Sequence, residues 1–484
     1  MDKGPSFNTS NLRLHLWYSR QVPRAGQPTD AEGRRLRDRI ALGVLTATFP
    51  PGLVDQVLER TGKREQRYRL LPARMVMYYV LAMSLFREAG YEEVLRQLSE
   101  GLGPLAGEAE ELELPSSVAV SKARSRLGPE PLEMLFSRAC VPLAGRGTKG
   151  ASYRDWRLVS MDGTVLDVPD NPENFSAFGR HRAGRGEAAF PQLRIVALAE
   201  CGTHAMFAAA MDGAGNGKDS GENTLAERLV GHVGPGMLLL ADRGFGGSYE
   251  LFDAFATTGA ALCWRVKSNA VLPVIERLSD NSYRSELPAT KRRAARGVRV
   301  VEYSIEDPGR PSAEDTTYRL MTTVVDPEAA PAAELAPLYG ERWEFETALD
   351  ELKAHQNAPR IVLRSKTPDG VRQEAWGMLC VHYAIRALMW RAADEGDVDP
   401  DRLSFTRSLR AARRSIRHAA DIGTAAHHFA IAEILAQLLP HRRLRSNPRV
   451  VRRKMSNFQV KHPEHRSWPQ PTRPIAQAIR VLGA

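Results

Sequence analysis

The sequence contains little cysteine, with only four cysteines among 484 residues. They stand far apart, and no two of them form a C-x-x-C pair: Cys140, Cys201, Cys263 and Cys380. This spacing argues against a zinc ribbon and against a disulfide framework. It favours a protein that works in a reducing cytoplasm.

The sequence also lacks a hydrophobic run long enough to cross a bilayer. The longest strongly apolar run, Met75–Phe86, lies between two arginines and is shorter than the roughly 20 residues that a membrane helix needs. The N-terminus is polar and carries no apolar signal-peptide core. We therefore expect no membrane partner, and we interpret Met75–Phe86 as a buried helix.

Acidic residues are fewer than basic ones, 57 Asp and Glu against 67 Lys and Arg, so the formal net charge is +10. A basic surplus favours anionic partners such as nucleic acid or acidic membrane surfaces, although alone it identifies neither. A length of 484 residues exceeds one ordinary hydrophobic core, and we expect two to four domains.

Helical patterning dominates the first part of the chain. Apolar residues recur at helical spacing from about residue 31 to residue 127, with a loop predicted at Gly101–Pro115. Ser116 or Ser117 is then expected to cap a short helix that exposes three basic residues: Lys122, Arg124 and Arg126. This helix fits either the recognition helix of a helix-turn-helix unit or a solvated helix end.

After a linker at Gly145–Ala151 the pattern changes to that of strands. WRLVSMDGTVLDVP is predicted to be a first strand, and PQLRIVALAE and THAMFAAAM a hairpin. MLLLADRGF is a buried strand that runs into a Gly-rich turn, followed by a helix over Ser248–Ala256 and the strand ALCWRVKS. This order predicts an α/β fold, a mixed sheet with flanking helices as in ribonuclease H.

A β-rich insertion with a basic lead-in is expected to interrupt this pattern at about Val271–Thr317. A long helix is predicted over Ala332–Lys353, and further helices over Gly370–Glu395 and Leu403–Leu439. From His441 the chain is basic and rich in Pro and Arg, and we expect it to pack only partly. The expected units are therefore an all-α domain at 1–145, the α/β domain at 152–390, and a helical and basic region at 391–484.

Two aspartates stand where the predicted sheet could bind a ligand. Asp162 interrupts an otherwise apolar strand, which is costly unless the carboxylate meets water, a partner or a metal. Asp242 follows the buried strand MLLLA, and strand ends of open α/β sheets are where ligand sites form. Both carboxylates could therefore hold a cation that prefers oxygen ligands.

The predicted helix over Ala332–Lys353 offers a third carboxylate. At ~100° per residue, one polar stripe combines Glu346 with an aromatic, a guanidinium and an ammonium group: Tyr339, Arg342 and Lys353. An apolar stripe beside it can pack on the sheet: Leu338, Phe345 and Leu352. A carboxylate beside phosphate-binding cations suits metal-assisted phosphodiester chemistry.

Other interpretations of these residues stay open. Asp162 could be structural, Asp242 could cap a turn, and Arg342 with Glu346 could form an ordinary surface ion pair. Other acids compete for the same roles: Asp167, Asp170, Glu341 and Glu344. Three histidines near the motifs are expected to be polar surface or core residues rather than ligands: His181, His204 and His355.

The segment YGERWEFETALDELK matches the Y-x2-R-x3-E-x6-K signature of the DDE transposases of the "insertion sequence four" family. Together with S-M-D-G-T and L-A-D-R-G-F, it places three blocks that resemble the family's active site in the family's order. The resemblance also includes AFPQLRIVALAECGTH and covers roughly Leu158 to Gln373. It is looser over the N-terminal region, which resembles the family's helical domain.

This resemblance implies cut-and-paste movement of an insertion sequence, by metal-dependent strand cleavage and strand transfer at terminal inverted repeats. It implies that Asp162, Asp242 and Glu346 hold two Mg²⁺ (or Mn²⁺) ions, and that Tyr339, Arg342 and Lys353 contact DNA. It further implies a ribonuclease H-like core, an N-terminal domain that binds DNA ends, and double-stranded DNA as partner. We expect a homodimer in the DNA complex and a location in the bacterial cytoplasm.

Basic residues elsewhere could grip DNA or form solvated faces. One helix face carries arginines at 3-4-3 spacing: Arg407, Arg410, Arg414 and Arg417. The insertion and the tail add Lys291, Arg292, Arg293, Arg296, Arg442, Arg443, Arg445, Arg449, Arg452, Arg453 and Lys454. Two alternatives remain at this point: a ribonuclease H-like nuclease or resolvase that cuts without joining, and a non-catalytic DNA-binding relic of a transposase.

Overall fold

The computed structural model describes residues 43–65, 71–100, 115–183, 186–215, 217, 221–290, 293–306, 317–356, 362–417, 425–440, 450–451, 459–460, 462–463 and 475–483. These residues all belong to one compact unit, Ala41–Ala484. Among them no helix is long and apolar enough to cross a membrane. Met75–Phe86 forms most of helix α3 and is largely buried, as expected.

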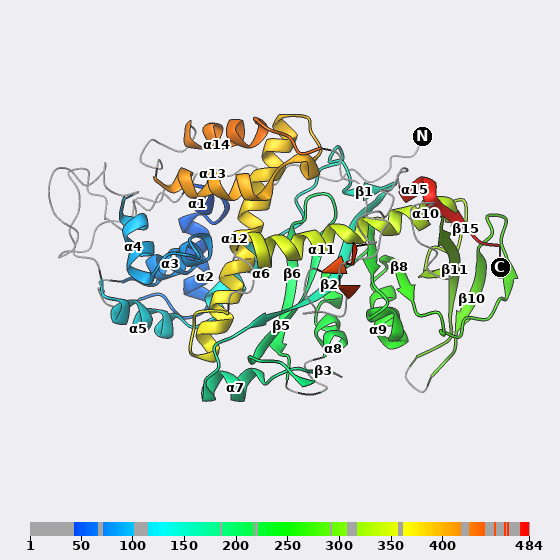
Figure 1. Cartoon of the computed structure of the whole chain (residues 1–484), viewed down its shortest axis with the longest axis horizontal. Coiled ribbons are helices and arrows are strands. Elements are labelled where there is room, and N and C mark those ends of the chain that lie inside the picture. Colours follow the sequence, from blue (N-terminus) through cyan, green and yellow to red (C-terminus); the bar gives the residue numbers. More distant parts are fainter. Residues whose placement is uncertain are drawn as a thin grey trace. The chain divides into compact units, whose positions relative to one another are not determined.

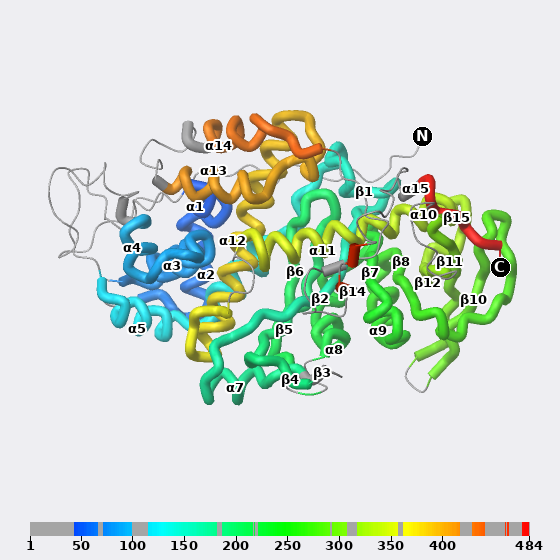
Figure 2. Tube along the Cα trace, in the orientation of Figure 1, coloured from blue at the N-terminus to red at the C-terminus, as the bar shows by residue number. Residues whose placement is uncertain are grey.

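An 11-stranded mixed sheet forms the centre of the unit. Across the sheet the strands run in the order β6 (Met206–Gly213), β5 (Gln192–Glu200), β2 (Trp156–Asp167), β7 (Met237–Ala241), β8 (Ala261–Val266), β12 (Tyr318–Thr322), β11 (Arg296–Ile305), β10 (Tyr283–Leu287) and β9 (Glu276–Arg277). β2, β7 and β8 are parallel, and β5 and β12 flank them antiparallel. Figure 2 follows the order from β7 to β10. The mixed α/β sheet predicted from the sequence is confirmed.

The predicted insertion does not fold apart from this sheet. Its strands β9, β10 and β11 pair antiparallel in succession and join the core through β12. Near the C-terminus, β15 (Ile479–Val481) adds to β11. The expectation that the chain packs only partly from His441 onward stays a prediction, because 441–449 and most of the residues up to 474 lie outside the described residues; this last strand is a part that does pack.

Helices cover both faces of the sheet because the strand residues alternate in direction. Val159 and Met161 of β2 pack in one core with α8 (Glu222–Glu227) and α9 (Tyr249–Ala256). Leu158 packs in a second core, on the other face, with α10 (Ala332–Leu338). Even-numbered β2 residues, among them Asp162, therefore face the chain that follows α10.

The expected helix over Ala332–Lys353 is present, but it is not a uniform α-helix. It comprises α10, a 3₁₀ turn at Tyr339–Arg342, α11 (Trp343–Asp350) and a π turn at Glu351–His355. Pro337 lies in the last turn of α10, where it lacks the backbone N–H that would continue the helical bonding. α11 therefore lies against β2 as the middle segment of one irregular helix.

The remaining helices surround α12 (Pro368–Glu395). The N-terminal helices are α1 (Val44–Thr48), α2 (Pro51–Arg60), α3 (Ala73–Leu85), α4 (Tyr91–Glu100), α5 (Ser117–Leu127) and α6 (Glu130–Ala139), and the later ones are α13 (Phe405–Arg417) and α14 (Ala425–Leu435). α12 contacts α3, α6, α13 and α14, and Figure 1 shows it between the N-terminal helices and the strands. The predicted all-α character of the N-terminal region is confirmed for the described residues.

Candidate active site

Strand pairing brings Asp162 and Asp242 side by side. β2 and β7 are parallel, and their register pairs Met161 with Ala241. Asp162 follows Met161 on β2, and Asp242 follows Ala241 directly after β7. The backbones of the two aspartates are therefore neighbours at the usual strand spacing of about 4.8 Å. The Asp162 Oδ1 accepts a hydrogen bond from the Gly163 N–H, and the Asp242 Oδ1 accepts one from the Gly244 N–H, both at 2.8 Å.

Glu346 reaches the same place from α11, which packs against β2. Its Oε1 lies 2.8 Å from Nη2 of Arg342, and Nη1 of the same guanidinium lies 3.5 Å from Oδ2 of Asp162. The Arg342 side chain is 9% exposed and the Glu346 side chain is 41% exposed. One buried cation therefore bridges two carboxylates, and Glu346 stays open to solvent.

The pKa of Asp162 reflects its burial first and its charged neighbours second. Burial raises it to about 6, against the opposing effects of the Gly163 hydrogen bond and the Arg342 charge. The negative charges of Asp242 and Glu346 raise it further. Three carboxylates in one partly buried place repel one another, and bound cations relieve such repulsion.

Tyr339 lies inside the protein. Its side chain is buried, and its hydroxyl donates to the carbonyl of Ala241, the residue before Asp242, at 3.2 Å. Burial raises the pKa of this hydroxyl, so it stays protonated as a donor. Tyr339 thus ties the 3₁₀ turn before α11 to the end of β7, which links the elements of Asp242 and Glu346.

Lys353, the last residue of the signature, is exposed on the π turn. The competing acids mostly have other partners. Asp167 accepts from Gln192 at 2.8 Å, and Asp170 pairs with Arg180 at 2.6 Å. Glu344 is buried on the far side of α11 from Glu346.

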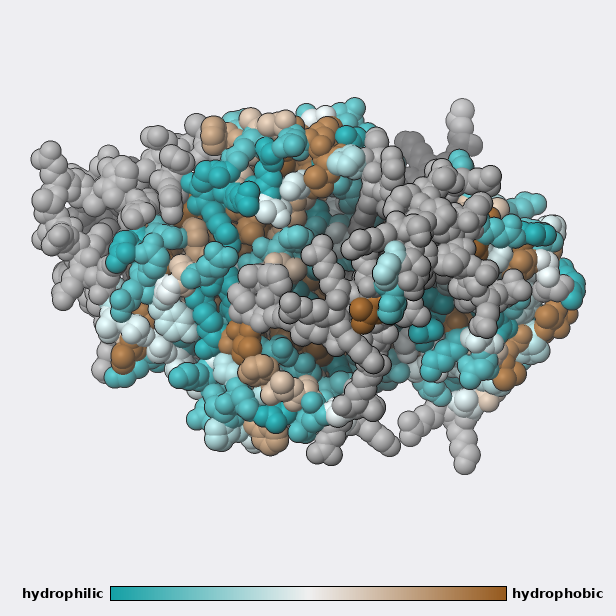
Figure 3. All heavy atoms as spheres, in the orientation of Figure 1, coloured by the Kyte–Doolittle hydropathy of each residue, from teal (hydrophilic) through white to brown (hydrophobic). Residues whose placement is uncertain are grey.

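The basic helix α13 presents only part of the predicted arginine stripe. Arg414 forms an ion pair with Glu433 of α14, and Arg407 donates to Gln437. Arg410 is exposed, and the side chain of Arg417 lies outside the described residues. Figure 3 shows hydrophilic residues gathered over α13. Arg293 is buried, and Arg296 pairs with Asp253, so neither gives a free basic surface.

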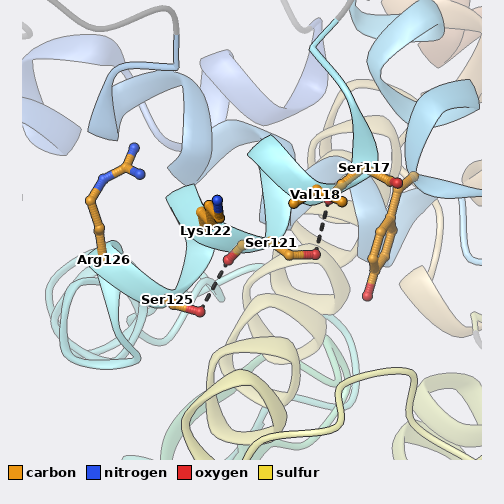
Figure 4. A pocket seen from close by; sticks show the side chains of 7 residues that line it. Ser117, Val118, Ser121, Lys122, Ser125 and Arg126 are labelled. Atoms are coloured by element: carbon orange, nitrogen blue, oxygen red, sulfur yellow. Dashed lines mark hydrogen bonds between the residues drawn. The ribbon is translucent and has the colours of Figure 1, made fainter.

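Helix α5 begins as predicted and exposes Lys122 and Arg126 as expected, but not Arg124. Ser116 caps it, its Oγ accepting from Ala119 N at 3.3 Å. The expectation that Arg124 is exposed is wrong: it is 7% exposed and donates to Gln373 and Ser365. The solvent-facing side of α5 lines a surface hollow together with Tyr91 of α4. The α5 residues that line it are labelled in Figure 4: Ser117, Val118, Ser121, Lys122, Ser125 and Arg126.

A buried cluster of charged side chains behind α11 was not predicted. The Nε2 atom of His204 lies 2.5 Å from Glu344 and 3.3 Å from Asp401, and Arg386 pairs with Glu351. The interpretation of His204 as a buried polar residue is consistent with its 2% exposure. Sequence patterns could not have revealed its partners, because they come from four separate elements.

Comparison with known proteins identifies the family. Residues 39–137 match the family described as "Insertion element 4 transposase N-terminal", and residues 154–384 match "Transposase DDE domain". The chain is 29% identical to Transposase InsG for insertion sequence element IS4 of Escherichia coli (strain K12), over 463 residues that cover 93% of this chain and 98% of that protein. It is 28% identical to Putative transposase InsZ of the same organism over 163 residues, 33% of this chain and 50% of that protein.

These matches confirm the resemblance seen in the signature residues. Transposases with this domain act on DNA and use divalent metal ions. The mixed sheet and its flanking helices are the ribonuclease H-like fold of the DDE domain. The chain belongs to the DDE transposases of the insertion sequence four family, enzymes that cleave and transfer DNA strands.

Proposed function

We propose that this transposase moves an insertion sequence by cut-and-paste, with Asp162, Asp242 and Glu346 as its catalytic carboxylates. The pairing of Met161 with Ala241 supports this most directly, because it makes two acids from distant blocks neighbours. The bridge through Arg342 brings Glu346 to the same place.

The same three residues would hold two Mg²⁺ or Mn²⁺ ions. Carboxylate oxygens are the ligands that these hard cations prefer, and the mutual repulsion of the acids supplies a reason to bind them. When bound, such ions activate the attacking hydroxyl and stabilise the leaving oxygen of a phosphodiester. The Glu346 side chain is more exposed than that of Asp162, so it is accessible to an incoming ligand.

We infer separate roles for the other signature residues. Tyr339 positions the strand end of Asp242 through the Ala241 carbonyl. Arg342 holds Asp162 and Glu346 together and is able to turn toward a DNA phosphate when cations replace it there. Lys353, exposed on the π turn, is placed to contact the DNA backbone.

We infer that the N-terminal helices up to residue 145 bind the element ends. The exposed serines, Lys122 and Arg126 of α5 are donors suited to phosphate and base-edge contacts. Arg407, Arg410, Arg414 and Arg417 of α13 would add backbone contacts. Two ends must be cut and joined to one double-stranded target, which favours a homodimer in the DNA complex. Its substrate places the enzyme on DNA in the bacterial cytoplasm.

A strand-transfer assay tests this proposal. The purified chain is incubated with Mg²⁺, labelled DNA that carries the element ends, and a target plasmid. We expect cleavage at the ends followed by covalent joining to the plasmid. Cleavage without joining would indicate a nuclease or resolvase, and end binding without either reaction would indicate a catalytically inactive relic.

A further inference from the structure

The helix that carries Glu346 is held from its opposite side by two buried carboxylates. Glu344 precedes Glu346 by two residues, and Glu351 follows it by five. At ~100° per residue, Glu344 and Glu351 point in nearly the same direction, roughly 140–160° around the helix from Glu346. Both are 5% exposed. One face of α11 therefore presents Glu346, and the other face carries buried charge.

His204 contacts both of these carboxylates. Its Nε2 lies 2.5 Å from Oε2 of Glu344, and its Nδ1 lies 3.5 Å from Oε2 of Glu351. The residue comes from the turn between β5 and β6 and has a φ of 55°, in the left-handed region that few residues other than glycine adopt. Such a conformation persists where the surroundings determine it strongly, as two carboxylates do here.

Arg386 of α12 fixes Glu351 a second time. Its Nη2 lies 2.5 Å from Oε1 of Glu351 and its Nε lies 2.9 Å from Oε2, a bidentate pair that sets orientation as well as distance. His382, one turn earlier on α12, lies 3.3 Å from the same Oε2. The buried face of α11 is thus bound to α12 and to the β5–β6 turn.

Glu346 lies on a helix whose winding changes on both sides of it. The α-helical segment α11 has eight residues, and it continues without interruption into both neighbouring turns. A 3₁₀ turn precedes it and a π turn follows it, so the buried side chains around α11 must fix its rotation about the helix axis. A rotation of roughly 10° would displace a side chain at the edge of a helix 10–12 Å wide by about 1 Å.

We propose that His204, together with Arg386, positions Glu346 for metal binding by fixing the rotation of α11. The inference rests on the proposed role of Glu346 as a metal ligand. A misplacement of about 1 Å at a reacting centre can cost a factor of ~10² in rate. His204 and Arg386 are positioning residues, since neither touches the three carboxylates of the site.

A second explanation of the cluster makes a different prediction. Ligand atoms of His204, Glu344 and Asp401 lie within 4.8 Å of one another, a spacing that a cation of its own could also bridge. The contact of Arg386 with Nδ1 of His204 favours the first explanation, because a guanidinium adds positive charge where a metal would bind. A structural metal would then be unnecessary for holding α11.

Direct Mn²⁺ binding to the full chain without DNA tests the proposal, with free Mn²⁺ followed by electron paramagnetic resonance. The variants are His204→Asn, which tolerates a left-handed backbone, and Glu344→Gln, which keeps size and hydrogen bonding. Glu374→Gln is the matched control, because it removes a buried carboxylate of α12 that does not touch α11. Melting temperatures are measured for all of them.

We expect His204→Asn to weaken Mn²⁺ binding about tenfold or more, the range seen when partners of metal ligands are removed. Glu344→Gln should act in the same direction, and Glu374→Gln should lower the melting temperature without changing Mn²⁺ affinity. Wild-type Mn²⁺ affinity in both His204→Asn and Glu344→Gln would overturn the proposal. A Zn²⁺ ion that binds the wild type at one per chain and is lost in His204→Asn would also overturn it. If His204→Asn does not fold, Glu344→Gln decides.

Failure of the underlying assignment gives a separate result. If Glu346→Gln itself binds Mn²⁺ like the wild type, Glu346 is not a ligand and the proposed function fails. If Glu346→Gln loses Mn²⁺ binding while His204→Asn and Glu344→Gln both keep it, only the positioning role is wrong.

Discussion

Arg342 lies between Asp162 and Glu346 and neutralises part of their charge within a largely buried setting. Its planar guanidinium reaches both acids at once through two separate nitrogens. Lysine offers a single point charge on a flexible stem and cannot reproduce this fork. The geometry of the carboxylate site therefore depends on a guanidinium at this position.

Two substitutions separate the roles of the signature cations. Arg342→Lys is expected to reduce strand transfer at least about tenfold, because lysine offers one nitrogen where arginine places two spaced nitrogens against the two carboxylates. Lys353→Ala should reduce strand transfer but leave the melting temperature unchanged, because Lys353 is exposed. Strand-transfer rates and melting curves are measured together. Normal DNA chemistry with a large loss of stability in Arg342→Lys would favour an ordinary structural ion pair.

His204 makes stability depend on pH. Burial lowers its pKa, but the Glu351, Glu344 and Asp401 carboxylates outweigh this and raise it well above its ordinary 6.5. The other charged groups that face this cluster are Arg386 and His382. The stabilisation is complete below about pH 6.5 and is lost as pH rises through the folded-state pKa. His204→Asn should therefore lower the melting temperature most below about pH 6.5 and progressively less as the pH is raised through the folded-state pKa; a loss that does not change with pH would argue against a charged imidazole.

At the scale of elements, a buried ion pair joins α12 to the chain that follows α3. Arg87 of the chain after α3 pairs with Glu374 of α12, and both side chains are 1% exposed. Although burial alone would raise the pKa of Glu374, the Arg87 charge and hydrogen bonds hold it below its usual value. Ser365 also donates to this carboxylate at 2.8 Å.

Glu374→Gln is expected to reduce the free energy of unfolding by about 3–5 kcal/mol near neutral pH, because it leaves the Arg87 charge buried without its partner. A carboxyl with a lowered folded-state pKa stabilises above its unfolded pKa of about 4.3, and the effect disappears as pH falls through the folded value. In urea unfolding, the wild type and Glu374→Gln should differ strongly in free energy of unfolding at pH 7 and only slightly at pH 3. A pH-independent difference would exclude the ionised pair as its cause.

The strands and the signature helix could be predicted because their information is local. S-M-D-G-T and L-A-D-R-G-F stand in apolar strands, and strand pairing then places their acids together. The 3₁₀ and π turns within the signature helix were not predicted, although Pro337 lies just before the first of them. The burial of Arg124 and the cluster around His204 could not be predicted, because their partners lie more than 100 residues away along the chain.

The C-terminal region calls for two separate experiments, since β15 belongs to the sheet. One variant replaces four arginines of the tail with alanine: Arg442, Arg443, Arg445 and Arg449. The slope of log DNA affinity against log salt concentration should become shallower by ~0.9 for each DNA phosphate that these arginines neutralise. Deleting residues 479–484 should instead lower the melting temperature, because it removes the strand that pairs with β11. Binding isotherms at several salt concentrations, with melting curves, distinguish the two. An unchanged slope in the alanine variant would rule out a DNA-binding tail.

At the scale of the whole molecule, one sheet joins the catalytic core to the insertion, and one helix joins the N-terminal helices to that core. β12 lies between β8 of the core and β11 of the insertion. α12 contacts α3 and α6 on one side and carries Arg386 against the Glu346 helix on the other. A DNA end held by the N-terminal helices would therefore be connected to the carboxylate site through packed elements.

The central claim is that three carboxylates from β2, β7 and α11 form one metal-dependent active site. The most direct test is the rate of end cleavage in Mg²⁺ by Asp162→Asn, Asp242→Asn and Glu346→Gln, each measured beside its affinity for the uncleaved end. We expect every variant to lose cleavage and joining while still binding the end, because each carboxylate supplies ligand charge. A variant that cleaves at nearly the wild-type rate would remove its residue from the site and contradict the account.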